Sequence, residues 1–382
     1  MRVSVAAFFL MMLFPLWGHL FPQPEVDSLE ENRSMTELLS SGSLQDRIKN
    51  LEAYLDDHLA FRQTVIASVL RANLDLGESP HPSVLSGFDG WLYYLEGGED
   101  FRRGLGLDRE MIVELYDVQQ QVADTFTAAG CDYRILVAPD KHSVYPQYLP
   151  LSSRMGTGPS VLDQMMEAPD PAYTVRFVDV RPALTAAAET GDQQYYKTDT
   201  HWSANGAFTA CQALLDALEK DHPSLHRLTE KDLRRTRITA SGDLAAMIGQ
   251  KGLREDHFEA VEVASPAARE DEERSDGELT VFVNDSIPDA PKMLLLHDSF
   301  GPAMTPFLME SVSELWLMSN DSPAFDSMGD LSRFDIVVFE VVERNRSWLW
   351  SGISNTSASG EEEEYSEEEY GEEDEYNDYE EE

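Results

Sequence analysis

The stretch Met293-Leu294-Leu295-Leu296-His297-Asp298-Ser299-Phe300-Gly301 is a short apolar run that ends in polar residues and a serine. An apolar run of this length is typical of a strand buried on both faces. Because helix-compatible sequence follows, Ser299 is predicted to lie at the carboxyl end of a strand, next to a helix N-terminus. The N–H groups and dipole of such a terminus can stabilise an oxyanion that develops beside the serine.

Comparable apolar runs on both sides of this stretch predict a sheet. Further buried strands are expected at residues 134–138, 176–180, 315–318 and 336–339, with an extra or edge strand at 280–283. Helical patterns separate several of them. Strands that alternate with helices indicate an α/β fold with a mostly parallel sheet that is covered on both faces. Ligands of such sheets bind outside the carboxyl ends of the strands.

A second polar motif, Lys197-Thr198-Asp199-Thr200-His201-Trp202, precedes a helix that Ser203 is expected to cap. Residues i and i+2 of an extended backbone project to the same side, so Asp199 can reach a ring nitrogen of His201. A serine hydroxyl is a weak nucleophile until a base takes its proton, and His201 oriented by Asp199 is such a base. We therefore predict a triad of Asp199, His201 and Ser299. The structural alternative is a hydrogen bond that only fixes the loop, together with a serine that only forms a turn.

Other polar and aromatic residues near the predicted strand ends are candidate substrate contacts. Each also has a structural interpretation as a turn residue, a packing residue or, for Arg344, an ion-pair partner of Glu340. The candidates are Lys141, Tyr145, Trp202, His297 and Arg344.

The charge of the chain is strongly negative, with a net charge of -42 over 382 residues. Residues 361–382 contain 15 acidic residues and no basic ones, and the remaining chain is still acidic. A nucleic-acid partner is excluded on this ground, because a phosphate backbone needs a basic surface. The acidic tail has too few apolar residues to offset its ordering entropy, so residues 351–382 are expected to be disordered.

The N-terminal residues 1–22 carry Arg2 and then no further charge, which predicts a signal anchor or a signal peptide. We favour the anchor, with the rest of the chain outside the membrane. A helical entry region is expected at 23–75, and the main domain at 76–350. Two cysteines, Cys131 and Cys211, are too few for a disulfide framework.

Three motifs together resemble the AlgX/AlgJ family of alginate O-acetyltransferases, which are SGNH-hydrolase-like. They are the Asp-Thr-His-Trp motif at 199–202, the Asp-Ser-Phe motif at 298–300 and the aromatic segment 89–93. The resemblance implies a flavodoxin-like, three-layer α/β/α domain. It also implies that Asp199, His201 and Ser299 are the orienting acid, the base and the nucleophile.

The resemblance further implies an exported enzyme that transfers acetyl groups onto hydroxyls of a polysaccharide. The acetyl group would come from a membrane-bound O-acyltransferase, and no cofactor or metal is implied. One departure is His297, where the family usually has glycine, so that a side chain there could crowd the turn or add a polar group to the site. Another is that only the acidic tail follows the domain, which is closer to the anchored AlgJ-like form than to one with a carbohydrate-binding module.

Two alternatives remain open from the sequence. A carbohydrate acetyl esterase would use the same triad with water in place of the sugar hydroxyl. A catalytically inactive protein for polysaccharide assembly or binding would keep the fold as a scaffold.

Overall fold

The computed structural model describes residues 81–95, 107–150, 158–322 and 328–353, together with residues 153 and 325 and a few positions before residue 81. The predicted membrane segment, most of the entry region at 23–75 and the acidic tail lie outside the described residues. Near the N-terminus, β1 (Ser28–Leu29) and β2 (Arg33–Ser34) pair as antiparallel strands. Among the described helices, none combines the length and the apolar character needed to cross a membrane.

The main sheet has seven strands in the order β6-β5-β13-β11-β12-β10-β9. The first five strands in this order pair in parallel, whereas β10 and β9 are antiparallel additions at one edge. The sheet is therefore mixed, with a parallel core. The strands are β5 (Asp132–Ala138), β6 (Phe177–Val178), β9 (Arg269–Glu270), β10 (Leu279–Val283), β11 (Lys292–His297), β12 (Glu314–Ser319) and β13 (Ile336–Val342).

All six strands expected from the apolar runs are present, and the additional strand β9 occupies the edge beyond β10. The strand predicted at 176–180 is shorter than expected, since β6 pairs with β5 through only Phe177 and Val178.

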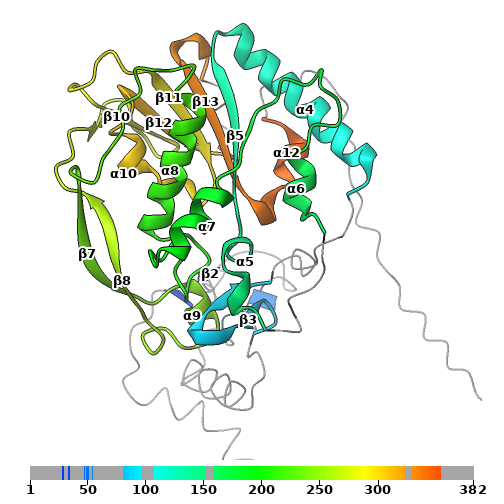
Figure 1. Cartoon of the computed structure of the whole chain (residues 1–382), viewed down its shortest axis with the longest axis vertical. Helices are drawn as coiled ribbons and strands as arrows, with labels where there is room; N and C mark the ends of the chain where they lie inside the picture. The colour runs from blue at the N-terminus through cyan, green and yellow to red at the C-terminus, as the bar shows by residue number, and fades with distance from the viewer. Residues whose placement is uncertain are drawn as a thin grey trace, which may run out of the picture.

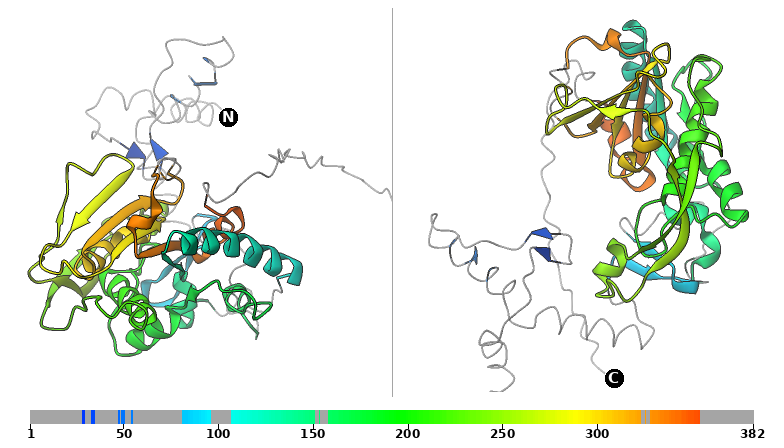
Figure 2. Two further views of the ribbon diagram at one scale, coloured as in Figure 1. Left: turned by 90° about the horizontal axis from the view of Figure 1, so that it is seen from above. Right: turned by 90° about the vertical axis from the view of Figure 1, so that its left-hand side faces the viewer.

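Helices pack on both faces of this sheet. One core places α7 (Arg181–Glu189), α8 (Ala204–Leu218) and α10 (Thr305–Leu308) against one face, which includes Leu295. A second core places α4 (Arg109–Ala128), α6 (Val161–Met165) and α12 (Trp348–Ser351) against the face that includes Leu294. In Figure 1 α7 and α8 lie together in front of the sheet, and Figure 2 shows α4 apart from them. The two cysteines are buried free thiols in different cores, so they do not pair.

The helix beginnings follow from local sequence. Ser203 precedes α8 and its side chain accepts a hydrogen bond from the Gly206 N–H, and Asp108 caps α4 in the same way through Glu110. These caps satisfy N–H groups that have no partner inside the helix. The cap at Ser203 also fixes the point at which the chain leaves the Asp-Thr-His-Trp loop.

Two hairpins and several short helical segments lie outside the main sheet. Strands β3 (Val84–Ser86) and β4 (Leu92–Tyr94) form a hairpin around an Asp-Gly turn, where Asp89 and Gly90 both have positive φ. Strands β7 (Leu233–Ala240) and β8 (Asp256–Val263) form a longer hairpin, on the left in Figure 1, that packs along α8. The short segments are η1 (Phe88–Gly90), α5 (Lys141–Val144), η2 (Pro146–Tyr148), α9 (Asp243–Met247), η4 (Gly301–Ala303), η5 (Leu331–Arg333) and η6 (Glu343–Asn345).

Candidate active site

The two polar motifs meet at the carboxyl end of β11. The His201 Nε2 lies 2.9 Å from the Ser299 Oγ, although the residues are 98 positions apart. On the other side of the ring, Nδ1 lies 2.7 Å from the Asp199 Oδ1, which also accepts a hydrogen bond from the His201 N–H at 3.0 Å. Ser299 is exposed, whereas the other two are partly buried. A hydroxyl, an imidazole and a carboxylate in this order have the geometry of a Ser-His-Asp triad.

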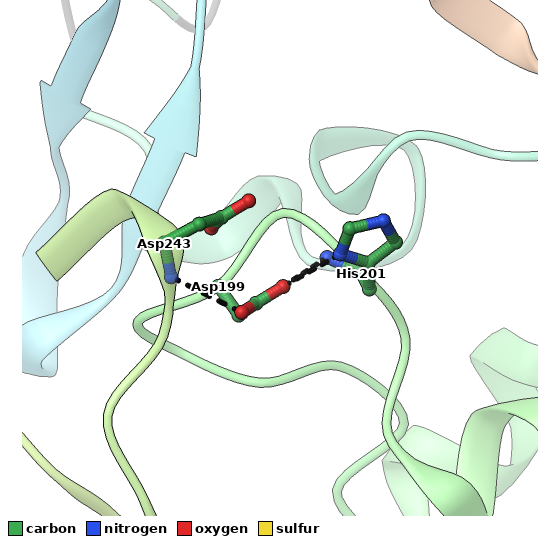
Figure 3. Close-up of side chains that lie close together, drawn as sticks. All are labelled: Asp199, His201 and Asp243. Atoms are coloured by element: carbon green, nitrogen blue, oxygen red, sulfur yellow. Dashed lines mark hydrogen bonds and ion pairs between the residues drawn. The ribbon is translucent and has the colours of Figure 1, made fainter. Parts of the chain in front are cut away.

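Both oxygens of Asp199 are engaged. The Asp243 N–H donates to the Asp199 Oδ2 at 3.1 Å, and Figure 3 shows the Asp199 carboxylate between Asp243 and His201. Burial by itself would raise the pKa of Asp199, but the hydrogen bonds and charge of His201 outweigh it and hold the pKa below its usual value. The carboxylate is therefore ionised and fixed, as a group that orients an imidazole must be.

Asp243 ties Thr200 into the same network, a role that the sequence did not reveal. Its carboxylate accepts hydrogen bonds from the Thr200 N–H at 2.8 Å and from the Thr200 hydroxyl at 2.7 Å. The neighbouring Gly242 leaves room for the loop, since a Cβ there would lie 2.3 Å from the Asp199 Cβ. The only signal in the sequence was the Ser-Gly-Asp pattern at 241–243, which spacing alone connects with no catalytic residue.

Asp199, His201 and Asp243 also present ligand atoms within 4.8 Å of one another, a spacing compatible with a cation. However, the carboxylate oxygens of this cluster already accept hydrogen bonds from the loop itself. The hydrogen-bonded network accounts for the cluster without a metal.

Asp256, at the start of β8, also fixes the loop at 197–202, and this role was not predicted from the sequence. This buried carboxylate accepts hydrogen bonds from the N–H groups of Lys197 and Thr198 at 2.7 and 3.1 Å. It accepts two more from the Thr198 hydroxyl at 2.5 Å and the Gln193 amide at 3.0 Å. Its partners lie 58 to 63 positions away, so no local pattern could have indicated it.

The turn that carries Ser299 is fixed by the preceding aspartate. The Asp298 carboxylate accepts hydrogen bonds from the N–H groups of Phe300 at 2.9 Å and Val342 at 2.7 Å. The Asp298 N–H in turn donates to the buried Glu340 Oε2 at 3.2 Å. Burial and the charge of Asp298 raise the pKa of Glu340 well above its usual value.

The helical segment expected after Ser299 is present but short. It begins at Gly301 and consists of the three-residue 3-10 helix η4 and the four-residue α10. Such short segments carry little aligned dipole. The Ser299 N–H makes no hydrogen bond with another described residue and is the available donor at the nucleophile itself.

His297 does not obstruct the turn, contrary to one of the two expectations for this position. A Cβ on Gly301 would lie 2.3 Å from the His297 Cβ, so the glycine at 301 provides the space that the histidine needs. The His297 Nδ1 lies 2.6 Å from the Asp298 carbonyl oxygen. Burial lowers the pKa of this imidazole.

Three of the predicted substrate contacts are buried and bond to the protein itself. The Lys141 amine donates to the carbonyls of Leu92 at 2.8 Å and Lys197 at 3.3 Å, and burial lowers its pKa to about 8. The Tyr145 hydroxyl accepts a hydrogen bond from the backbone N–H of residue 194 at 2.9 Å. The Trp202 Nε1 donates to the carbonyl of residue 300 at 3.1 Å. They hold the loops of the site together.

Arg344 pairs with Asp140 at 2.6 Å, and the pairing with Glu340 considered from the sequence is wrong. Its guanidinium also lies 5.3 Å from the ring centre of Phe300 and 5.7 Å from that of Tyr94. Arg344 therefore lies against both β4 and the turn that carries Ser299.

A cavity of about 620 Å³ opens beside the candidate triad, and Asp199, His201 and Ser299 form part of its lining. Its volume lies within the roughly 300–1,000 Å³ of small-molecule sites. The arrangement as a whole can activate a serine hydroxyl for acyl transfer beside a space that admits a ligand.

Comparisons with known proteins point to the same chemistry. A family model for the SGNH hydrolase-like domain of the acetyltransferase AlgX matches residues 84–321. A probable alginate O-acetylase AlgJ of Pseudomonas putida is 28% identical over 139 residues, which are 36% of this chain and 34% of that protein. The AlgJ of Pseudomonas syringae pv. tomato is 27% identical over 177 residues, covering 46% and 43%. The matches thus span less than half the length of these relatives.

Two solved structures are similar in fold. A DHHW family protein from Eubacterium siraeum has a TM-score of 0.51 at 17% identity, covering 73% of this chain and 100% of that chain. PatB1 from Bacillus cereus has a TM-score of 0.50 at 14% identity, covering 69% and 96%. At these identities the similarity concerns the fold alone.

Proposed function

This chain belongs to the family of SGNH hydrolase-like domains of the acetyltransferase AlgX, and from that we propose that it is an O-acetyltransferase that forms an acetyl ester on Ser299. The observation that carries the proposal is the chain of contacts from the Asp199 Oδ1 through His201 to the Ser299 Oγ. A protein that uses this fold only as a scaffold does not need a carboxylate, an imidazole and a serine hydroxyl in line.

In the proposed mechanism the Ser299 Oγ attacks the carbonyl carbon of an acetyl donor while the His201 Nε2 takes its proton. Asp199 stabilises the imidazolium that forms, and the Ser299 N–H donates to the oxyanion. The imidazolium then protonates the leaving group, which leaves acetyl-Ser299. A sugar hydroxyl then gives its proton to His201 and attacks the acetyl carbonyl carbon. The bond from that carbon to the Ser299 Oγ breaks, and His201 returns the proton to this oxygen.

The acceptor and the donor are part of the proposal. Relatives that are probable alginate O-acetylases favour a polysaccharide acceptor. We propose that the N-terminal segment anchors the protein at the membrane, with the domain outside the cytoplasm, where a membrane-bound O-acyltransferase supplies the acetyl group.

The proposal is tested with the full-length protein and 4-nitrophenyl acetate. We expect intact-mass spectrometry to show one added acetyl group, or nitrophenol release where turnover is fast, and Ser299→Ala to abolish both. Ser265→Ala, an exposed serine with no role in the proposed mechanism, is the matched control and should behave as wild type. Equal acetylation in wild type and Ser299→Ala would refute the assignment. With an oligosaccharide added, release of acetate alone would favour an esterase over a transferase.

A further inference from the structure

The cavity beside Ser299 is walled by segments that are far apart in the sequence. Ser299 and His201 lie in its lining, and the rest comes mainly from β8, the start of α8 and the segment from η4 to the end of α10. Two of its wall residues, Val261 and Phe307, belong to the main core and are buried. This part of the wall is therefore fixed by packing.

Most of the surface beyond the triad is apolar. Val261, Val263, Ala303, Phe307 and Met309 all contribute to it. The cation in the lining is Arg234, and its guanidinium bonds to the Glu262 Oε2 through Nε at 3.0 Å and Nη2 at 2.8 Å. Because this charge is already paired, the cavity offers little to a carboxylate or a phosphate, whereas its walls suit a hydrocarbon group.

An acetyl group is much smaller than this space. One water molecule takes up about 30 Å³ of liquid volume, so the three non-hydrogen atoms of an acetyl group need on the order of 100 Å³. The cavity has about 620 Å³. A chain several methylenes longer could extend from the Ser299 ester along the apolar wall.

We propose that this cavity is an acyl-chain site, so that the enzyme accepts linear acyl groups longer than acetyl, hexanoyl among them. The inference rests on the proposed acyl-serine mechanism and specifies its substrate class. The Ser299 Oγ forms the new ester bond, the bond from the carbonyl carbon to the leaving oxygen breaks, and that oxygen takes the proton from His201. The alkyl chain then lies in the cavity, and the acceptor hydroxyl approaches from the open side.

The test measures kcat/KM of the full-length protein for 4-nitrophenyl acetate and hexanoate. Each methylene buried against the wall should raise kcat/KM about two- to fourfold. We therefore expect hexanoate to exceed acetate by at least about tenfold. Ala303→Phe should reduce the hexanoate to acetate ratio by about tenfold or more, because its ring would take up part of the space along the apolar wall. Met309→Trp narrows the same space from a partly exposed position and should lower the ratio in the same direction. Ala172→Phe, at an exposed site outside the cavity, should keep the wild-type ratio.

The outcomes separate the two proposals. If wild type cleaves acetate at least as well as hexanoate, or if both cavity variants keep the wild-type ratio, the acyl-chain site is refuted and the acetyltransferase proposal stands. If Ser299→Ala cleaves both esters like wild type, the acyl-serine mechanism fails. In that event saturation-transfer NMR with hexan-1-ol tests the cavity directly: binding that Ala303→Phe abolishes supports an alkyl site, and no binding to wild type refutes it.

Discussion

Gly242 shows how a residue without a side chain controls the acid of the candidate triad. A Cβ at this position would lie 2.3 Å from the Asp199 Cβ and 2.6 Å from its Cα. Neither atom is the end of a flexible side chain, so the backbone of the loop would have to move. The absence of a Cβ at residue 242 is thus what allows the Asp199 backbone and carboxylate to lie where they do.

Gly242→Ala should therefore displace Asp199 and uncouple it from His201. We expect kcat for 4-nitrophenyl acetate to fall at least tenfold and the free energy of unfolding to fall by about 1–3 kcal/mol, the usual cost of overpacking. Gly277→Ala is the matched control, because a Cβ there meets nothing within 4 Å. Wild-type kcat in Gly242→Ala would mean that the position of Asp199 does not limit turnover.

Glu340 is a buried carboxyl directly behind the nucleophile turn, and its protonation links stability to pH. Its pKa is raised by burial and by the charge of Asp298. Because the pKa of Glu340 is higher in the folded state than in the unfolded chain, its protonation adds to the free energy of unfolding. This contribution is fully present below the ordinary pKa of about 4.3 and is lost as the pH rises through the folded-state pKa.

Glu340→Gln keeps an oxygen that can accept from the Asp298 N–H and removes the titration. We expect its melting temperature to fall less than that of wild type as the pH is raised from mildly acidic to mildly alkaline. Glu189→Gln, which removes an exposed carboxyl, should follow the wild-type profile. The same pH profile in Glu340→Gln and wild type would exclude a titrating Glu340.

At the scale of elements, the loop at 197–202 is held by strands and helices that the sequence does not connect with it. The Asp256 carboxylate in β8 accepts hydrogen bonds from the N–H groups of Lys197 and Thr198. The Asp243 carboxylate at the start of α9 accepts one from the N–H group of Thr200. The loop is thus fixed between the β7–β8 hairpin and α9 before any ligand is bound.

Asp256→Asn replaces one acceptor oxygen with an NH₂ group, which must face an N–H donor of the loop. A buried donor left without a partner costs about 1–3 kcal/mol, and we expect the melting temperature and kcat both to fall. Hydrogen exchange should accelerate in the 193–202 segment relative to wild type. Asp289→Asn, an exposed change, is the control. Unchanged exchange in this segment would show that Asp256 does not hold the loop.

Sequence patterns predicted the elements whose cause is local. The apolar runs predicted all six expected strands, and Ser203 predicted the beginning of α8, because burial on both faces and helix capping depend on residues that are close in the sequence. The meeting of His201 with Ser299 was also predicted, because a serine hydroxyl needs a base to act as a nucleophile.

What the sequence could not predict depends on distant partners. Asp256 contacts residues about 60 positions away, and Arg344 pairs with Asp140 across 204 positions. The residues next to Asp256 and Arg344 in the sequence do not indicate these partners. The lengths of β6 and of the helical segment after Ser299 could not be predicted, because apolar or helix-compatible composition does not determine how far an element extends.

At the scale of the whole molecule, the two cores share the strands of one sheet. Leu294 belongs to the core with α4 and Leu295 to the core with α8, and both side chains are fully buried. Because neighbouring residues of β11 face opposite cores, neither core can lose its packing without exposing the sheet that supports the other. The domain should therefore unfold as one unit despite its size.

Leu294→Ala and Leu295→Ala test this coupling from opposite faces of one strand. Each should lower the free energy of unfolding by about 2–5 kcal/mol, as expected for a buried leucine. Both variants should keep a single transition, with the same midpoint by circular dichroism and by calorimetry. Leu253→Ala removes a side chain that is 62% exposed and should change stability by no more than about 0.5 kcal/mol. If either core variant showed two separate transitions, the cores would be independent, and the loops that carry His201 and Ser299 would rest on parts of the molecule with different stabilities.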